Sequence, residues 1–448
     1  MNLKQLISLF AASGVIKLLA KPLAENDNSK NQVYFAGAVE ALNVFPIKKV
    51  FAKDTSQGPS FKATMDFFWL LENGSLVSAP NAQLILYSQY PEVRFSGFLK
   101  GCEIPPSRLM MDRQRAEKSG KCIVKELKGR VLFLGITSNQ KVIGYVAPGN
   151  SEIVKQFNLS GFNQTLLVFH DIPLPGTLTD KKSKELLVKE LRRINLKGWI
   201  NSKQLNKNGV FEPCNASQCG GYTLEAELGI PKNSKAEPDF YGWEVKQHSV
   251  GNFENVNSGS AITLMTPEPN GGFYKEKGIE KFIRTFGYKD KNGVPDRINF
   301  GGIHRVGEKQ TTTGLKLVVE GYDLEKHEIT KADGKLALVT AKGVVAASWS
   351  FSGLFSHWSR KHEKAVYVPS QMRMDPVRQY CYGNIVRLAQ STNSLKFLDC
   401  LISNAIFYDP GIKMEFASTK PNIKRRSQFR IASKNIPKLY ESLEIVHL

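Results

Sequence analysis

The sequence predicts a multidomain protein in which an all-β domain precedes an α/β domain. The chain has 448 residues, and because a typical domain holds about 100–200 residues, two domains are expected. Between residues 32 and 174, short runs of β-type composition alternate with turn signals. From residue 220 onwards, patterns typical of helices alternate with patterns typical of strands, as in an α/β domain.

The first domain is expected to be a small barrel or sandwich. Its N-terminal segment, residues 1–24, superficially resembles a secretion signal. However, Lys17 and Lys21 interrupt or follow the apolar stretch, and no run reaches the roughly 18 residues of a membrane span. Apolar residues recur at helical spacing from Leu3 to Phe10, which predicts an amphipathic helix packed on this domain. The clearest strand patterns follow at Gln83–Ser88, Val131–Ile136, Lys141–Val146 and Thr165–Phe169.

A polar and charged segment, residues 178–184, is a predicted linker between the domains. It places the first domain at residues 1–177 and the second at residues 185–448. A helical pattern over Ser183–Asn195 indicates the first helix of the second domain. The other predicted elements are strands over Leu315–Val319 and Lys335–Thr340 and a helix over Asn384–Asn404.

The charge balance indicates a polyanionic partner. Lysine and arginine number 61 against 41 aspartates and glutamates, so the formal net charge is +20. An excess of this size repels itself in the folded chain unless a polyanion or counterions offset it. Nucleic acid is the commonest such partner, and a basic enzyme with an unrelated substrate is the alternative.

The six cysteines predict neither a zinc site nor a disulfide framework. Only Cys214 and Cys219 lie close together, and their spacing is wider than that of a zinc-type CxxC. All six are expected to be free thiols in a reducing cytosol, which predicts a cytoplasmic protein.

Four residues carry the predicted chemistry. Phe240–Gln247 is a predicted strand, and the period of two along a strand puts Glu244 and Lys246 on one face. Asp239 stands at the start of that strand, and Glu225 lies on a predicted helix upstream. The sequence therefore predicts that three carboxylates and one amine converge.

This set of side chains suits metal-assisted hydrolysis of a phosphodiester. Two or three carboxylates can hold Mg²⁺ through oxygen ligands, and the metal would polarise the phosphate and lower the pKa of a bound water. The Lys246 ammonium would position or deprotonate that water and offset the charge that builds on phosphorus. A solvated strand face with neighbouring charges is the alternative, but Glu225 and the aromatic residues of the strand favour a buried site.

The segment from Glu225 to His248 resembles the catalytic core of restriction endonucleases of the MvaI/BcnI type, which are related to the MutH-type repair nickases. In that family a helix glutamate precedes the aspartate by 14 residues, as Glu225 precedes Asp239. The glutamate and lysine then stand where Glu244 and Lys246 stand, and His248 matches a histidine of the MvaI-like branch. The resemblance spans residues 185–448 and includes Ser348–Phe351, Leu354, Tyr408–Gly411 and Phe429–Ile431.

The resemblance implies an α/β PD-(D/E)XK fold of the MutH-like kind and a bacterial, Mg²⁺-dependent type II site-specific deoxyribonuclease. Members of the family act as monomers on double-stranded DNA at five-base-pair sites of the CC-N-GG kind, and CCWGG is the expected target. The implied metal ligands are Glu225, Asp239 and Glu244, and the implied catalytic residues are these three together with Lys246 and Tyr408. One departure is that residues 420–428 lack the active-site histidine that the family carries there. The implied DNA-binding residues of this domain are His248, Lys424, Arg425, Arg426 and Arg430.

The N-terminal domain more loosely resembles the EcoRII-type effector domain, a B3-like DNA-binding pseudobarrel, through the patch Tyr90–Phe98. This resemblance implies a type IIE-like enzyme whose first domain binds a second copy of the DNA site. Most protein–DNA hydrogen bonds go to phosphates, so several of its basic residues are expected to contact the backbone. The candidates are Arg94, Arg108, Arg113, Arg115 and Lys121.

Two other hypotheses stay open: a MutH-like repair nickase that depends on a partner ATPase, and a DNA-binding regulator with an inactive nuclease fold. The separate β domain argues against the first, and the intact set of four charged residues argues against the second. No membrane partner is expected. No nucleotide is expected either, because neither Gly271–Gly272 nor Gly301–Gly302 precedes the lysine of a phosphate loop.

Overall fold

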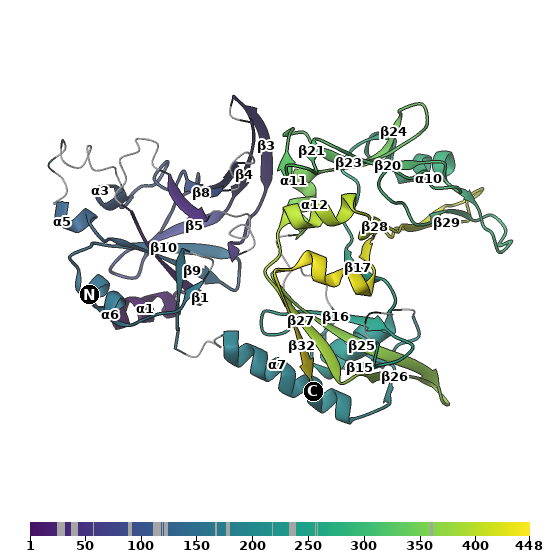
Figure 1. Cartoon of the computed structure of the whole chain (residues 1–448), viewed down its shortest axis with the longest axis horizontal. Helices are drawn as coiled ribbons and strands as arrows, with labels where there is room; N and C mark the ends of the chain where they lie inside the picture. The colour runs from purple at the N-terminus through teal and green to yellow at the C-terminus, as the bar shows by residue number, and fades with distance from the viewer. Residues whose placement is uncertain are drawn as a thin grey trace. The chain divides into compact units, whose positions relative to one another are not determined.

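The structure, a computed structural model, consists of two compact units, Met1–Thr179 (unit 1) and Asp180–Leu448 (unit 2) (Figure 1). Arg113, Arg115 and Lys121 lie outside the described residues. No helix in the described part of the chain is long and apolar enough to cross a bilayer. The structure describes residues 1–24, 32–36, 44–56, 58–87, 92–110, 118, 120, 124–165, 168–175, 180–216, 218–232, 239–255, 257, 259–358 and 362–448.

In the part of unit 1 that the structure describes, the chain forms two sheets and short helices. A seven-stranded sheet has the order β11-β12-β1-β9-β10-β5-β6, and a five-stranded sheet has the order β2-β8-β7-β4-β3. The strands are β1 (Val15–Pro22), β2 (Val33–Ala36), β3 (Val50–Thr55), β4 (Gly58–Thr64), β5 (Asp66–Leu70), β6 (Leu76–Ser78), β7 (Gln83–Tyr87), β8 (Glu92–Ser96), β9 (Val131–Thr137), β10 (Lys141–Ala147), β11 (Gln164–Thr165) and β12 (Phe169–Ile172). The helices are α1 (Leu3–Ala12), α3 (Ser107–Met110), α5 (Val124–Leu127) and α6 (Glu152–Leu159).

The two sheets of unit 1 share an aromatic core. The ring of Phe35 on β2 lies 5.0 Å from that of Phe95 on β8 and 5.3 Å from that of Phe169 on β12. Phe67 on β5 lies 5.0 Å from Phe95. Because β2 and β8 belong to one sheet and β5 and β12 to the other, these buried rings join the inner faces of both sheets.

The amphipathic helix predicted at the N-terminus is confirmed. Asn2 and Gln5 form a capping box at the start of α1, and the helix buries its apolar face against β1 and α6. The single strand predicted over Thr165–Phe169 is wrong. These two residues pair with each other across the antiparallel strands β11 and β12, so they belong to two strands.

Unit 2 is organised around a six-stranded sheet. Its order is β13-β26-β25-β27-β32, and β16 pairs in parallel with β25; Figure 1 shows β16, β25, β27 and β32 together, with α7 beside them. The bounds are β13 (Ile200–Asn201), β16 (Glu244–Ser249), β25 (Lys364–Met374), β26 (Arg378–Tyr382), β27 (Ile385–Gln390) and β32 (Ser442–His447).

Among the described residues, unit 2 also contains smaller sheets and seven helices. The small sheets are β14-β15 (Lys203–Leu205, Phe211–Pro213), β17-β31-β28 (Ile262–Met265, Phe429–Ile431, Ile406–Tyr408), β18-β19-β29-β30 (Tyr288–Lys289, Ile298–Gly301, Gly411–Glu415, Asn422–Lys424), β20-β23-β24 (Lys316–Glu320, Lys335–Val339, Val345–Ser350) and β21-β22 (Tyr322–Asp323, Glu328–Ile329). The helices are α7 (Asp180–Leu196), α8 (Cys219–Glu227), α9 (Phe273–Lys277), α10 (Ile279–Phe286), α11 (Phe351–Trp358), α12 (Ser394–Ile402) and the 3₁₀ helix η2 (Ser433–Leu439).

The first helix of unit 2 is longer than its sequence pattern predicts. Leu187, Leu191 and Ile194 of α7 are buried against the six-stranded sheet, as expected. The helix begins at Asp180, so residues 180–184 are helical and do not form the predicted linker. Nothing in this stretch breaks a helix: lysine favours the helical state, and an aspartate suits the first turn.

The predictions for the later elements are partly confirmed. β20 and β23 lie where strands are predicted. The helix predicted over Asn384–Asn404 is wrong in its first half, because residues 385–390 form β27 and only α12 is helical. β27 pairs with β25 on one side and β32 on the other. A strand inside a sheet and buried on its faces has a near-continuous apolar run, which periodicity alone does not distinguish from a buried helix.

Candidate active site

The candidate site is built on β16, which begins later than predicted. Residues 240–243 form a tight turn: the Phe240 and Trp243 backbones exchange hydrogen bonds of 3.0 and 2.9 Å, and Gly242 takes a φ of 84° that glycine adopts without strain. The Trp243 indole donates to Ser183 Oγ on α7 at 3.1 Å. The turn brings Asp239 back beside the strand.

Asp239, Glu244 and Lys246 come together at the start of β16. One oxygen of Asp239 accepts a hydrogen bond from the Val245 backbone N–H at 3.0 Å. Glu244 is 2% exposed, and its Oε1 lies 2.6 Å from the Lys246 Nζ. The structure therefore juxtaposes two carboxylates and the amine that the sequence predicts to converge.

The charge state of Lys246 follows from these neighbours. Burial lowers the pKa of Lys246, but the Glu244 and Asp239 carboxylates raise it more, so the net pKa is above its ordinary value. Lys246 is therefore an ammonium at neutral pH. In this arrangement it can orient a water and offset negative charge, but it is not poised to accept a proton.

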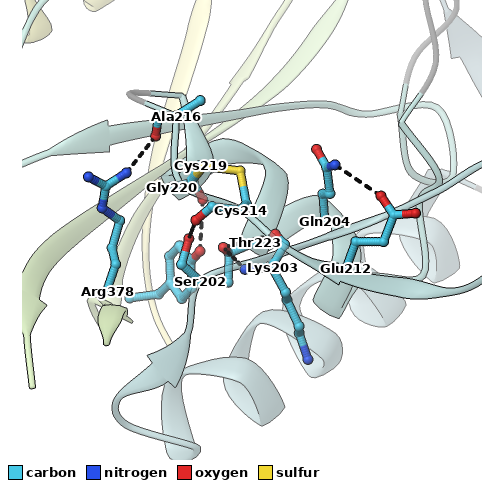
Figure 2. Close-up of a disulfide and its surroundings, with 11 residues drawn as sticks. Ser202, Lys203, Gln204, Glu212, Cys214, Ala216, Cys219, Gly220, Thr223 and Arg378 are labelled. Atoms are coloured by element: carbon cyan, nitrogen blue, oxygen red, sulfur yellow. Dashed lines mark hydrogen bonds between the residues drawn. A yellow bond between two sulfur atoms is a disulfide. The ribbon is translucent and has the colours of Figure 1, made fainter. Parts of the chain in front are cut away.

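Glu225 is carried by α8, which is attached firmly to its surroundings (Figure 2). The Tyr382 hydroxyl donates to the Gly220 carbonyl at 2.8 Å, and the Thr223 hydroxyl bonds to the backbone N–H and carbonyl of Lys203 at 3.0 and 3.1 Å. The helix packs directly on β16: a Cβ added at Gly220 would lie 2.9 Å from the Gln247 side chain. Glu225 itself is half-buried.

The free-thiol prediction is wrong for one pair of cysteines. Cys214 lies before α8, and Cys219 is the first residue of that helix. The two form a disulfide with their Cα atoms 5.7 Å apart, a separation that a disulfide can bridge. The close approach of the two Cα atoms is a property of the folded chain that sequence spacing does not reveal. Cys102, Cys381 and Cys400 are free, and Cys122 lies outside the described residues. The cytoplasmic prediction loses the support that it took from free thiols.

The C-terminal end of α8 is held by ion pairs. The buried Glu227 carboxylate lies 2.7 Å from the Lys197 Nζ, 2.6 Å from the Lys203 Nζ and 3.5 Å from Arg193. Burial raises the pKa of Glu227, but the hydrogen bonds from the two lysines lower it by more. The net pKa is therefore below its usual range. The disulfide and this cluster together fix both ends of the helix that carries Glu225.

The predicted metal-ligand set is only partly assembled. Within the described part of the chain, no group of three or more acidic, histidine or cysteine side chains is placed to hold a metal ion. Asp239 and Glu244 both act on Lys246, and carboxylate oxygens are the ligands that Mg²⁺ prefers. The donor chemistry of these two residues fits Mg²⁺, and Glu225 does not complete a three-ligand group in this structure.

Tyr408 and Arg430 belong to the three-stranded sheet β17-β31-β28. Tyr408 is 1% exposed, with its ring 4.7 Å from that of Trp349, and burial raises its pKa despite a hydrogen bond with Ser427. Its hydroxyl thus stays protonated inside the core, and the position gives no support for the predicted catalytic role. Arg430 donates to Asp409 and to the Ala261 carbonyl, both at 2.6 Å, which holds its guanidinium in one orientation.

His304, a buried histidine that no sequence motif singles out, lies against Tyr408. The ring of His304 is fully buried, its centroid is 5.8 Å from that of Tyr408, and its nitrogens lie 2.8 Å from the Gly302 carbonyl and 3.0 Å from the Thr313 hydroxyl. Burial lowers the pKa of His304 to about 4. It is neutral at physiological pH and helps to fix the sheet that carries Arg430.

Apart from Arg430, the predicted DNA-binding residues of unit 2 are either exposed or buried. Lys424 at the end of β30 and Arg425 and Arg426 just after it are exposed, and the Lys424 Nζ lies 3.3 Å from Glu415. His248 is 2% exposed, so the structure does not present its ring at the surface.

Two candidates of unit 1 are described. Arg94 on β8 pairs with Glu92 at 2.7 Å and lies 5.6 Å from the Tyr87 ring centre. Arg108 is exposed on α3 and lines a cavity of about 240 Å³ together with Glu72 and Tyr145.

Comparison with known proteins places this site in a family. Residues 188–440 match the model of the MvaI/BcnI restriction endonuclease family. The solved complex of restriction endonuclease MvaI with cognate DNA is 16% identical, with a TM-score of 0.44, and the match covers 60% of this chain and 99% of that one. MvaI in the absence of DNA is 15% identical, with a TM-score of 0.33 and coverage of 61% and 100%. A search of curated proteins finds no match. Because the family model covers more than half of the 448 residues, the chain belongs to the MvaI/BcnI restriction endonuclease family.

Proposed function

We propose that this protein is a Mg²⁺-dependent type II restriction endonuclease that cuts double-stranded DNA at a CC-N-GG-type site, with CCWGG as the first candidate. The observation that carries the proposal is the juxtaposition of Asp239, Glu244 and Lys246 at the start of β16, inside the segment that matches the family. The proposed enzyme works as a monomer and needs no nucleotide or membrane.

Each residue of the site has a distinct proposed role. Asp239 and Glu244, with Glu225 as the third candidate, would hold the metal, which would supply Lewis acidity at the phosphate and lower the pKa of the attacking water. The backbone N–H of Val245 orients Asp239. Lys246 keeps its proton, because both carboxylates raise its pKa, and its ammonium stabilises the negative charge that develops on the phosphoryl oxygens.

DNA recognition is assigned to the end of the chain. Arg430 is the proposed base reader, because an arginine whose guanidinium is held in one plane suits bidentate contact with guanine O6 and N7. The exposed Lys424, Arg425 and Arg426 are proposed to contact phosphates, which position the protein without reading sequence. His248 is buried and is proposed to support the strand rather than to contact DNA.

Unit 1 is proposed to bind a second copy of the DNA site, as a B3-like effector domain. Its two-sheet, β-rich architecture is compatible with that role, and Arg94 and Arg108 are its described candidate contacts. A MutH-like nickase, or a regulator with an inactive nuclease fold, is the alternative that the test must exclude.

The test is cleavage of plasmids that carry one or two CCWGG sites, with Mg²⁺ and with EDTA. Discrete double-strand cuts that require Mg²⁺ would support the proposal, and faster cutting of the two-site plasmid would support the effector role of unit 1. Cutting of one strand only would favour the nickase. A retarded band without any cutting would favour the regulator.

A further inference from the structure

We infer that Arg387 is a positioning residue that couples the strand of Glu244 and Lys246 to the segment that follows Arg430. The inference rests on the proposed function, because the roles of Lys246 and Arg430 are assigned there. Arg387 lies in β27 and is 2% exposed.

Arg387 stands in a row of side chains that begins at the candidate site. Lys246 on β16 pairs with Tyr367 on β25, and Tyr367 pairs with Arg387 on β27. Residues directly opposite each other on adjacent strands share a face of the sheet. The guanidinium carbon of Arg387 lies 5.9 Å from the centre of the Tyr367 ring. The Tyr367 hydroxyl is in turn 3.0 Å from that of Tyr440, so the row is anchored inside the fold.

The guanidinium of Arg387 contacts three separate segments. It donates from Nη1 to the Ser433 carbonyl at 2.9 Å and from Nη2 to the Ser433 hydroxyl at 2.7 Å. Its Nη1 also lies 3.3 Å from the Asn257 Oδ1, and its Nη2 lies 3.5 Å from the Nε2 of His248. His248 is two residues beyond Lys246 on the same strand face, so one guanidinium touches β16, the connection from β16 to β17 and the start of η2.

Asn257 and Ser433 lie on the segments that flank β17 and β31 of the sheet that carries Arg430. Asn257 lies in the connection from β16 to β17, just before Ala261, whose carbonyl accepts a hydrogen bond from Arg430. Ser433 is the first residue of η2, three residues after Arg430. A displacement of β31 therefore reaches β16 through Arg387, and Arg387 sets the spacing between the proposed base reader and the candidate catalytic residues.

A contribution to stability alone does not explain why an arginine occupies position 387. Among the described residues no carboxylate forms an ion pair with Arg387, and burial lowers its pKa to about 10, which still leaves it protonated at neutral pH. A buried cation without a paired anion destabilises a fold, and an apolar residue of similar size would cost less. What an apolar residue lacks is a planar fork of donors that holds several groups at fixed angles.

The experiment compares Arg387→Met, Arg387→Lys and Arg284→Met in the full-length chain. Arg284 is the control for losing an arginine outside the row: it also donates to a backbone carbonyl of unit 2, that of Ala417, at 2.6 Å, but it lies exposed on α10 and pairs with Glu280. Single-turnover cleavage of a duplex with a CCWGG site is measured with Mg²⁺, and the Kd for the same duplex is measured in EDTA. Thermal unfolding of each variant shows whether it is folded.

The expected result is a separation of rate from affinity. Because small misplacements of catalytic groups cost large factors in rate, Arg387→Met should slow cleavage by at least about 10-fold while Kd changes by less than about 3-fold. Arg387→Lys should be intermediate, and Arg284→Met should match the wild type. A wild-type rate for Arg387→Met, or equal losses in rate and affinity, would overturn the inference.

Two further outcomes are also decisive. If Arg387→Met does not fold, Ser433→Ala takes its place, because it removes one hydrogen bond of 2.7 Å and keeps the backbone carbonyl; a wild-type rate for that variant overturns the inference. If the wild type cuts no DNA, the proposed function fails and takes this inference with it. Cutting by the wild type with an equal rate in the Arg387 variants refutes the inference alone.

Discussion

Replacing Lys246 by methionine tests the centre of the candidate site most directly. The change keeps the length of the side chain but removes its charge, so Glu244, which is 2% exposed, loses the partner that lies 2.6 Å away. Removing one member of a buried ion pair costs about 3–5 kcal/mol. Because the Lys246 side chain is 21% exposed, water can partly replace the ammonium, and we expect a loss near the lower end, about 3 kcal/mol.

A double-mutant cycle with Glu244→Gln isolates the pair itself. The free energy of unfolding is measured for the wild type, both single variants and the double variant by urea titration, followed through tryptophan fluorescence. A coupling energy above about 1 kcal/mol is expected for groups in direct contact. Additive losses would refute the pairing of these two side chains in solution.

The raised pKa of Lys246 predicts that the stability gained from this ion pair depends on pH. The folded-state pKa of Lys246 is raised, because the carboxylates outweigh burial. Its stabilising contribution is therefore fully present below its unfolded value of about 10.4 and is lost as the pH rises through the higher folded value. The stability difference between the wild type and Lys246→Met should shrink in that alkaline range.

Cleavage by the Lys246→Met variant should fall at least about 10³-fold with DNA binding retained, and wild-type cleavage would refute the assigned role.

The remaining predictions concern the metal, the disulfide and the DNA contacts. Asp239→Ala should abolish Mg²⁺-dependent cutting of a plasmid while gel-shift affinity is largely kept; cutting at the wild-type rate would show that the site is wrongly assigned. Replacing Cys214 and Cys219 by serine opens a short loop, and chain entropy predicts a loss of about 2 kcal/mol in the free energy of unfolding; a variant as stable as the wild type in non-reducing urea titrations would contradict this. Replacing Arg425 and Arg426 by alanine should weaken binding to all DNA sequences and reduce the slope of log K against log salt by about 2 if both contact phosphate; an unchanged slope would remove them from the interface.

Much of the candidate site could be predicted because its residues lie close together in the sequence. Asp239, Glu244 and Lys246 fall within eight positions, and a strand period of two is enough to put the last two on one face. The structure changes one detail, since Asp239 reaches the site through the turn over residues 240–243. Glu225 was expected on an upstream helix and matches the family spacing, but its approach to β16 depends on how α8 packs.

Other features could not be predicted from the sequence because they depend on contacts between distant segments. Arg387 lies in a stretch that resembles a helix, and its role appears only when β27 pairs with β25 and β32. The burial of Tyr408 and His248 depends on layers packed above them, and no local pattern reports those layers. The Cys214–Cys219 disulfide depends on how the folded chain brings the two residues together, whereas their spacing alone suggested free thiols.

The sequence by itself determined the chemistry available to this protein: a strongly basic chain, a β-rich first half, and an Asp-X4-Glu-X-Lys segment in a restriction endonuclease family. These follow from composition and short-range periodicity, which are properties of neighbouring residues. The tertiary structure alone decided which charges meet, which are buried and which stay exposed. Burial and pairing depend on long-range contacts, and those contacts set the charge of Lys246, hold Arg430 in place and enclose Arg387 without an ionic partner among the described residues.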